Sequence, residues 1–311
     1  MSTVGAGALA QAYTACEVLA RSHYENFPVA SMLLPKAMRP HVAAVYAFAR
    51  RADDIADEGT APGPARRASL DDWLRRLHDA VDVRLKPDAT NVAANAVDDL
   101  TLLATAHSIR TLDLPLSLFD DLVSAFAQDT TTTRYASWSD VLDYCRRSAN
   151  PVGRLVLRIA GYQDPALDQS SDALCTALQL TNFWQDFGRD WRAGRLYVPA
   201  DVQSAAGADE RQLSATAAAG LTDAWTRAIE RCVAFTRERF AEGRAVCDGV
   251  RGRLRWELRL TWLGGSRILD RVERDRGSLM QRRPALGAAD APLLLMRALM
   301  WPSPPPGLRR D

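Results

Sequence analysis

The stretch Leu178-Gln-Leu-Thr-Asn-Phe-Trp-Gln-Asp-Phe-Gly-Arg-Asp190 decides how the rest of this 311-residue chain is interpreted. Its polar side chains recur at offsets of 0, 3, 7 and 11 and therefore share one face of a helix: Gln179, Asn182, Asp186 and Asp190. The flanking residues are mostly leucines and aromatics, which are too apolar for a surface helix. The pattern predicts a buried helix that carries an acidic stripe.

A second stretch has the same character: Val45-Tyr-Ala-Phe-Ala-Arg-Arg-Ala-Asp-Asp-Ile-Ala-Asp57. Its polar residues lie at offsets of 0, 4, 7 and 11 and form a stripe roughly 60° wide on a helix: Tyr46, Arg50, Asp53 and Asp57. The rest of the segment is mostly apolar. Such a stripe either faces water or lines an internal cavity.

The two pairs of aspartates suggest a shared cation. Like charges four residues apart destabilise a helix by about 0.2 to 0.5 kcal/mol, and burial raises that cost unless a cation relieves it. Oxygen ligands without histidine or cysteine suit Mg²⁺, which completes its shell with water and substrate phosphate. We therefore expect all four carboxylates to face a buried site that binds a diphosphate, with these metal ligands: Asp53, Asp57, Asp186 and Asp190.

The alternative is that both pairs are solvated, because an isolated Asp-x-x-x-Asp spacing usually lies on a helix surface. The spacing occurs twice more in this chain. Asp164 to Asp168 crosses Pro165 and is predicted to be a loop, and Asp168 to Asp172 is predicted to be a solvated helix start.

Helical periodicity dominates the chain, and the strict alternation typical of strands is nearly absent. Helices are predicted over residues 41–56, 70–85, 92–110, 141–160, 171–192, 216–246 and 251–274. Turns or loops are predicted at residues 59–64, 86–87, 114–115, 164–165 and 199–207, and Pro40 suits the first turn of a helix. We expect one all-α domain over residues 1–300 and a flexible tail over residues 301–311.

Charge and composition exclude several classes of protein. The chain has 39 basic and 38 acidic residues and a formal charge of +1, so we expect no nucleic-acid partner. Its five cysteines form no Cys-x-x-Cys pair and its four histidines no His-Glu-x-x-His motif, which argues against a zinc site. Residues 5–10 match Gly-x-Gly-x-x-Ala, but only four residues precede them and the rest of the chain is predicted to be helical, so no nicotinamide cofactor is expected.

The chain shows no signal peptide and no segment of the roughly 20 apolar residues that a membrane span needs. Its most apolar stretch, residues 291–301, is short and is interrupted by Arg297. Residues 237–283 hold 13 arginines against 7 acids, which is typical of a solvated face but also suits an anionic membrane surface. We expect a cytoplasmic protein that makes transient peripheral contact with the inner face of the membrane.

Two further segments carry polar residues of interest. Asp143-Tyr-Cys-Arg-Arg-Ser-Ala-Asn-Pro-Val-Gly153 places Tyr144, Ser148 and Asn150 in a helical context near a proline, where a kink can mark a site. A tyrosine at the edge of the core beside a structural proline is the alternative. In Gly194-Arg-Leu-Tyr-Val-Pro199, Arg195 can clamp a diphosphate by paired donors or simply be solvated.

Together these segments resemble the squalene/phytoene synthase family over roughly residues 20 to 285. The resemblance also rests on His23-Tyr-Glu-Asn-Phe27, Leu33-Leu-Pro35 and Arg195-Leu-Tyr197. Within the family the chain is most similar to the hydroxysqualene synthases of bacterial hopanoid biosynthesis. The resemblance implies a single-domain isoprenoid-synthase helical bundle with a central cavity.

The resemblance also implies a role for each matching residue. The four aspartates would bind Mg²⁺ and diphosphate and act in catalysis, and Tyr144 would act as an acid, as a base or as a cation stabiliser. The substrate, presqualene or farnesyl diphosphate, would be bound by Phe27, Tyr46, Arg50, Asn150, Gln179, Asn182, Arg195, Tyr197 and Arg282.

Two departures from the family pattern bear on the reaction. Many members have arginine where this chain has Gln185, and many have Val-Ala-Gly where this chain has Ser148-Ala-Asn150. Both suit the conversion of presqualene diphosphate to hydroxysqualene with capture of water. The alternatives are head-to-head condensation of two farnesyl or geranylgeranyl diphosphates to squalene or phytoene, and a non-catalytic helical scaffold with solvated aspartates.

Overall fold

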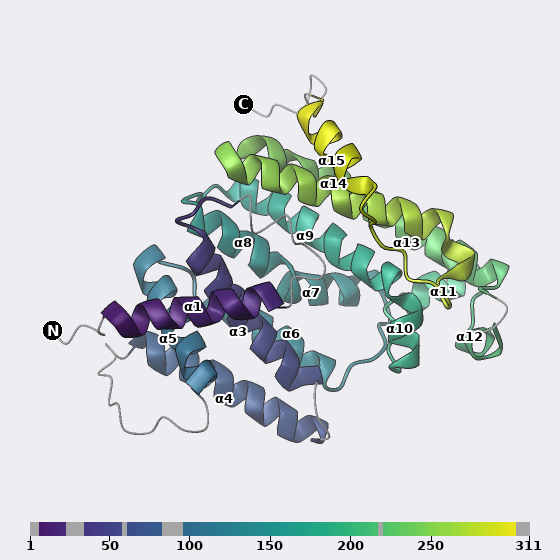
Figure 1. Cartoon of the computed structure of the whole chain (residues 1–311). Helices are drawn as coiled ribbons and strands as arrows, with labels where there is room; N and C mark the ends of the chain where they lie inside the picture. The colour runs from purple at the N-terminus through teal and green to yellow at the C-terminus, as the bar shows by residue number, and fades with distance from the viewer. Residues whose placement is uncertain (1–5, 23–33, 58–60, 83–95, 217–219, 303–311) are drawn as a thin grey trace.

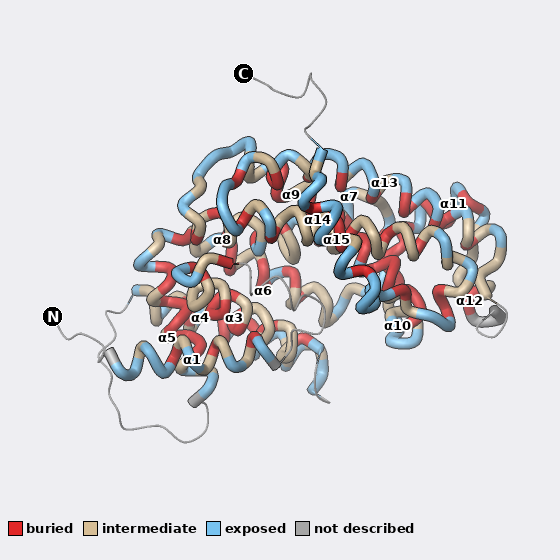
Figure 2. The backbone as a smooth tube through the Cα atoms, turned by 45° about the horizontal axis from the view of Figure 1, so that its top comes forward, coloured by how far each residue is buried: buried red, intermediate tan, exposed pale blue. Residues whose placement is uncertain are grey.

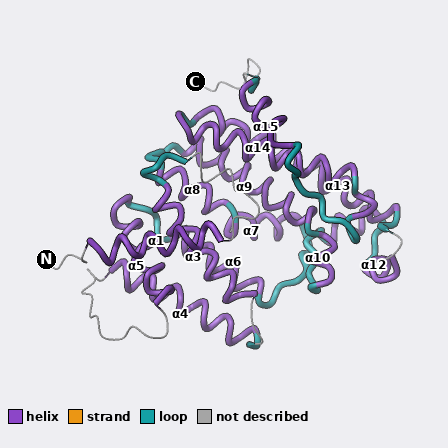
Figure 3. Tube along the Cα trace, viewed as in Figure 1, coloured by secondary structure: helices purple, strands orange, loops and turns teal. Residues whose placement is uncertain are grey.

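The computed structural model describes residues 6–22, 34–57, 61–82, 96–216 and 220–302. Within these ranges the chain is helical, and its β-structure is limited to a single bridge between Arg134 and Leu196. Figure 3 shows helices joined by loops throughout the described part of the chain. The predicted all-α class is confirmed.

The N-terminal part of the chain forms a group of helices at one end of the molecule (Figure 1): α1 (Ala6–Ser22), α3 (Arg39–Asp57), α4 (Gly63–Asp82) and α5 (Ala96–Leu112). As predicted, Pro40 lies in the first turn of α3, where a missing N–H costs nothing. Helix α1 packs on α3 and α5 through small buried residues: Ala12, Cys16, Ala20, Ala43, Ala44, Ala47 and Ala104. This close packing fixes α3, which carries the first pair of aspartates at its C-terminal end.

The central helices are α6 (Ser117–Asp129), α7 (Trp138–Ser148) and α8 (Asn150–Ile159). The prediction of one helix over residues 141–160 is wrong, because the chain breaks at Ala149, where φ is −113°. Pro151 lies in the first turn of α8 and has no N–H to continue the hydrogen bonding of α7. The break lies beside Tyr144, Ser148 and Asn150.

The C-terminal part consists of α9 (Pro165–Gln185), α10 (Phe187–Arg192), α11 (Ala200–Ala206), α12 (Glu210–Thr216), α13 (Asp223–Gly249), α14 (Gly252–Arg274), the 3₁₀ helix η1 (Arg276–Ser278) and α15 (Asp290–Leu299). Helix α9 packs along α13, α14 covers both, and α15 lies on α14 (Figure 1). The prediction of one helix over residues 171–192 is also wrong. Asp186, at φ −92° and ψ 8°, separates α9 from α10.

Three segments predicted as loops contain helix starts, since α4 begins at Gly63, α9 at Pro165 and α11 at Ala200. Asp164 caps α9 by accepting a hydrogen bond from the amide of Ala166 at 2.8 Å, and Asp168 lies in the first turn of that helix. Residues 200–206 form α11, which ends at Gly207 with φ +70°. In each place a proline precedes the helix or lies in its first turn, because its fixed φ suits a helix start as well as a turn.

One hydrophobic core runs through all three groups and includes the fully buried side chains of Trp73, Trp184 and Trp225. Figure 2 shows buried residues lining the inner faces of the helices. Trp301 packs against this core, where its Nε1 donates to Asp248 at 3.0 Å and its ring meets that of Trp262. Residues 303–311 of the predicted tail lie outside the described residues.

Candidate active site

Arg195 is the point at which the two aspartate segments meet. Its Nη1 donates to a carboxylate oxygen of Asp57 at 3.0 Å, and its Nε lies 4.0 Å from a carboxylate oxygen of Asp190. Gly194 precedes it with φ +82°, a conformation that favours glycine. The turn after α10 therefore directs the guanidinium toward the end of α3.

The first pair of aspartates differs from the prediction that all four acids are inside. The side chains of Asp53 and Asp57 are 39% and 40% exposed, and they lie at the rim of the site. Arg50 pairs with Asp53 at 3.3 Å and with Asp54 at 2.8 Å. Partial burial and the neighbouring Asp57 raise the pKa of Asp53 to about 6, although Arg50 opposes the shift.

The second pair is more deeply placed, with side chains 14% and 18% exposed at Asp186 and Asp190. Burial raises the pKa of Asp190 to about 7; Arg195 opposes the shift and the negative charge of Asp186 adds to it. Asp186 accepts hydrogen bonds from Asn182 Nδ2 at 3.1 Å and from Arg283, whose Nε and Nη2 lie 2.5 Å and 3.2 Å away. The four acids therefore do not share one environment.

From the C-terminal part of the chain, Arg283 reaches the second pair, whereas the predicted Arg282 is exposed. Two contacts position the segment from Leu279 to Pro284, which carries Arg283. Gln185 Nε2 donates to the carbonyl of Pro284 at 2.6 Å, and a Cβ on Gly188 would lie 2.6 Å from the carbonyl oxygen of Leu279. The glutamine that departs from the family pattern thus anchors the loop that brings an arginine to Asp186.

Aromatic side chains lie beside the carboxylates. Tyr144 is buried, and its hydroxyl donates to Asp129 at 2.7 Å. The rings of Phe183 and Tyr197 stack at 3.7 Å with an interplanar angle of 7°, and Tyr144 lies against both. Tyr135 stacks on the ring of Tyr197. These rings form an aromatic wall, defined here as Tyr135, Tyr144, Phe183 and Tyr197.

Asp129 is a residue that the sequence did not reveal, because it lies in the polar run Gln128 to Arg134 without helical spacing to another acid. Burial raises its pKa to about 7; the hydrogen bond from Tyr144 opposes the shift, and Asp57 contributes to it. This electrostatic link to Asp57 joins the aromatic wall to the aspartates in one site.

The remaining predicted residues are distributed around this site. Tyr46 is half-buried on α3, one turn before Arg50, and Gln179 is partly exposed on α9. Asn150 is buried, and its Oδ1 accepts a hydrogen bond from Thr176 at 3.0 Å. Ser148 Oγ is buried and has no hydrogen-bond partner in the described part of the chain. Phe27 lies outside the described residues.

The predicted cluster of four metal ligands is not gathered in this structure. Among residues 6–22, 34–57, 61–82, 96–216 and 220–302, no three histidine, cysteine or acidic side chains converge on one point. Arginines lie among the carboxylates instead: Arg50 on Asp53, Arg195 between Asp57 and Asp190, and Arg283 on Asp186. The donors are nevertheless all oxygens, and the raised pKa values of Asp53 and Asp190 mark a site where a cation would be favourable.

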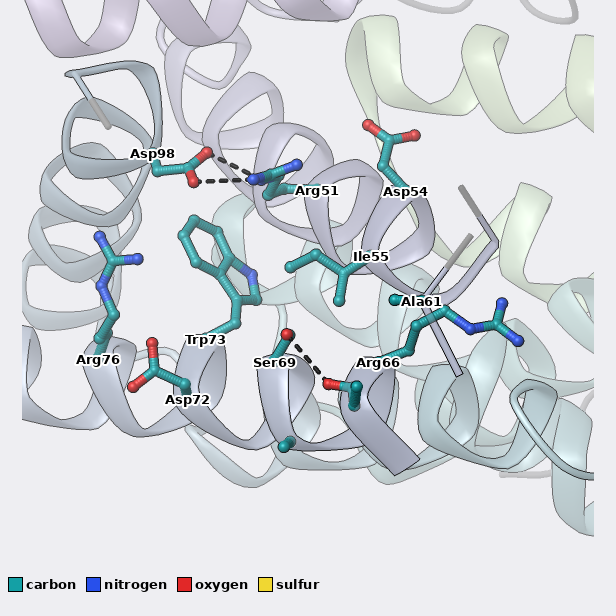
Figure 4. A pocket seen from close by; sticks show the side chains of 12 residues that line it. Arg51, Asp54, Ile55, Ala61, Arg66, Ser69, Asp72, Trp73, Arg76 and Asp98 are labelled. Carbon is teal, nitrogen blue, oxygen red and sulfur yellow. Dashed lines mark hydrogen bonds and ion pairs between the residues drawn. The ribbon is translucent and has the colours of Figure 1, made fainter. Parts of the chain in front are cut away.

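A separate pocket of about 770 Å³ lies between α3, α4 and α5 (Figure 4). Charged and small side chains line most of it, and it includes the ion pair between Arg51 and Asp98 at 2.9 Å. None of the predicted site residues lines this pocket, and its walls lack the continuous apolar surface that a prenyl chain requires. It is not the predicted prenyl cavity.

Comparison with known proteins shows that one family model spans all the segments that form this site. The sequence profile described as squalene/phytoene synthase matches residues 20–290. The chain belongs to the squalene/phytoene synthase family. The match includes both aspartate segments, the segment of Tyr144 and the loop of Arg283.

Among family members, a hydroxysqualene synthase from Zymomonas mobilis is 38% identical over 185 residues, which are 59% of this chain and 58% of the relative. A phytoene synthase from Mycobacterium tuberculosis is 31% identical over 191 residues, 61% of this chain and 58% of the relative. These matches therefore cover less than two thirds of each relative's length.

Solved structures of the family extend the comparison. The crystal structure of the squalene synthase HpnC from Alicyclobacillus acidocaldarius has 38% identity and a TM-score of 0.75, and the match covers 86% of this chain and 95% of that one. A dehydrosqualene synthase has 19% identity and a TM-score of 0.76, with 94% and 97% covered. The second likeness demonstrates the shared isoprenoid-synthase helical fold.

Proposed function

We propose that this chain converts presqualene diphosphate and water to hydroxysqualene and diphosphate. The observation that carries the proposal is the meeting of both aspartate segments at Arg195, next to the aromatic wall. The 38% identity to proteins named hydroxysqualene synthase and squalene synthase HpnC supports the choice of substrate.

The arginines and aspartates form alternating charges that suit a diphosphate together with a divalent cation. The pairs Asp53/Asp57 and Asp186/Asp190 would hold Mg²⁺, which would supply charge neutralisation for the leaving diphosphate. Arg50, Arg195 and Arg283 would then exchange their carboxylate partners for phosphate oxygens. Once they hold the phosphate oxygens, the guanidinium groups would stabilise the developing negative charge without further reorganisation, which promotes departure of the diphosphate.

The carbocation that remains would lie against the aromatic wall, because the faces of aromatic rings attract cations. Ser148 lies one turn after Tyr144 on α7, and its buried, unpartnered hydroxyl suits the positioning of water better than Asn150, which already accepts from Thr176. Addition of water releases a proton. Asp129, with a pKa of about 7, would accept that proton through Tyr144.

Head-to-head condensation of two farnesyl or geranylgeranyl diphosphates is the second candidate, and the identity to a phytoene synthase supports it. We expect the protein to act in the cytoplasm, where a prenyl lipid product brings it to the inner face of the membrane. A non-catalytic scaffold with solvated aspartates is disfavoured by the low exposure of Asp186 and Asp190.

The test is product analysis by gas chromatography with mass spectrometry. The purified chain is incubated with Mg²⁺ and either presqualene or farnesyl diphosphate, with and without NADPH. We expect hydroxysqualene from presqualene diphosphate without NADPH, and a shift toward other products in Ser148→Ala. An unchanged product mixture in both Ser148→Ala and Asn150→Gly would remove the water-positioning role. No diphosphate release from either substrate would contradict the enzymatic function.

A further inference from the structure

The outward face of α15 is apolar. Five of the six residues 295–300 are exposed, and four of these five have large apolar side chains. Leu295 and Met296 are about half exposed, and Leu299 and Met300 are each 72% exposed. We call these four residues the α15 face: Leu295, Met296, Leu299 and Met300. Figure 1 places α15 at the outer edge of the molecule, beside α14.

A helix on the surface of a globular protein normally directs its polar side to solvent. Helix α15 instead buries its acidic residue and exposes large apolar side chains. Its one acid, Asp290, is buried and pairs with Arg271 at 2.7 Å and with Arg267 at 3.3 Å. Its inner side packs through Asp290 and Ala298, so the α15 face points away from the protein. A contiguous patch of this kind marks an interaction surface.

The surroundings of the α15 face are basic and aromatic. Arg297 lies on α15 itself, and Arg244 stacks on the ring of Trp301 just after the helix, at 4.7 Å. Arg259 lies over the same ring at 5.2 Å, is largely buried and pairs with Asp248 at 3.2 Å. Trp256 is 38% exposed and lies under Arg259. Arginine next to tryptophan beside an apolar helix face is typical of the interface of a bilayer, where rings and cations meet the headgroups.

The dimensions favour a lipid surface over a second protein chain. Helix α15 has 10 residues, so at about 1.5 Å per residue it is roughly 15 Å long. Four side chains on such a helix cover far less than the roughly 800 Å² per partner that a stable protein interface needs. No helix in the described ranges is long and apolar enough to cross a membrane. A short helix that lies in the plane of the membrane–water interface needs only a small apolar face and does not cross the bilayer.

We propose that α15 docks this protein on an anionic bilayer, with the α15 face inserted among the acyl chains and Arg297 and Arg244 on the lipid phosphates. The proposal concerns binding alone and holds whichever prenyl reaction the site performs.

The experiment is co-flotation of the full-length protein with vesicles, in the absence of any prenyl substrate. One set of vesicles contains phosphatidylcholine alone, and the other contains phosphatidylcholine with phosphatidylglycerol. The variant is the double substitution Leu295→Glu with Leu299→Glu. Val18→Glu is the matched control, because Val18 is 60% exposed on α1, outside the α15 face. Thermal unfolding of each variant establishes that it is folded.

We expect binding to the anionic vesicles, weaker binding to the neutral ones, and a loss of about tenfold or more in the double variant, because the apolar term is removed and charge repulsion is added. Val18→Glu should bind as the unsubstituted protein does. Equal binding by the double variant, or no binding to anionic vesicles at all, would overturn the proposal. Self-association in solution that the double variant abolishes would also overturn it, because a second copy would then be the partner.

Discussion

The two aspartate segments have the same spacing and different structures. On α3, Asp53 and Asp57 follow one another on an uninterrupted helix and remain partly exposed. In the second segment the helix ends at Asp186, a new helix begins, and both carboxylates are largely buried. A four-residue spacing therefore identifies candidate ligands without defining the backbone that presents them.

The difference extends to the residues that compensate the charges. Asp53 pairs with Arg50, three residues earlier on the same helix. Asp186 pairs with Arg283, which is 97 residues later in the chain. Asp57 in turn pairs with Arg195, 138 residues later, and Arg195 also approaches Asp190, five residues before it. Each segment therefore combines a local arginine with a distant one, and the segments differ mainly in how deeply their acids are buried. This difference in burial predicts how each segment responds to substitution.

The largest effect is expected from Asp186→Ala. This substitution should lower kcat/KM for diphosphate release by about a thousandfold or more, because it removes a buried carboxylate and leaves the charge of Arg283 uncompensated. Asp53→Ala should also abolish most turnover, with little loss of stability because its carboxylate is partly exposed. Asp172→Ala is the control, since Asp172 lies on α9 and pairs with Arg154, outside the site. Mg²⁺-dependent activity retained in Asp186→Ala would contradict the assignment of this residue.

A smaller effect is expected from Arg195→Lys, about a hundredfold in kcat/KM, because an ammonium group cannot replace the planar array of donors that links Asp57 to Asp190. Arg211→Lys is the control, with a side chain that is 91% exposed. Steady-state kinetics of diphosphate release measure both variants. If Arg195→Lys retained full activity, the link between the two segments would have no catalytic role.

The smallest effect concerns stability. The pKa of Asp190 rises from 3.8 to about 7 on folding, so the folded protein keeps a proton that the unfolded chain releases. This contribution to stability is present below pH 4 and is lost as the pH rises toward about 7. Asp190→Asn should remove about 2 kcal/mol of that pH dependence, a value reduced for solvent screening. Asp53→Asn should remove less, because Asp53 is more exposed.

Urea unfolding at a series of pH values, in buffer with EDTA, measures this effect. The expected result is a flatter dependence of unfolding free energy on pH in Asp190→Asn than in the unsubstituted protein. Equal slopes in both proteins would show that Asp190 titrates normally in the folded state. A larger change in Asp53→Asn than in Asp190→Asn would reverse the proposed order of burial.

Much of the fold and part of the site could be predicted from the sequence. Apolar periodicity identified helices, and the aspartate stripes together with Arg195 identified residues that the structure brings into contact. The helix breaks at Ala149 and Asp186 were missed, because periodicity continues across a break when both helices contact the same core. Asp129 and Arg283 were missed for another reason. Their roles arise from contacts with distant residues, and neither has a spacing that reveals them.

The separation between Asp186 and Arg283 also has a consequence for synthesis of the chain. A ribosome adds residues from the N-terminus, so the 97 residues between these partners take roughly 5 to 20 s to make at typical rates. During that interval α3 already has Arg50 beside its acids, while Asp186 has emerged without its most distant partner. A product that stops before residue 283 would contain both aspartate pairs and an incomplete site. The last part of the chain to be translated therefore sets the moment at which the site is finished.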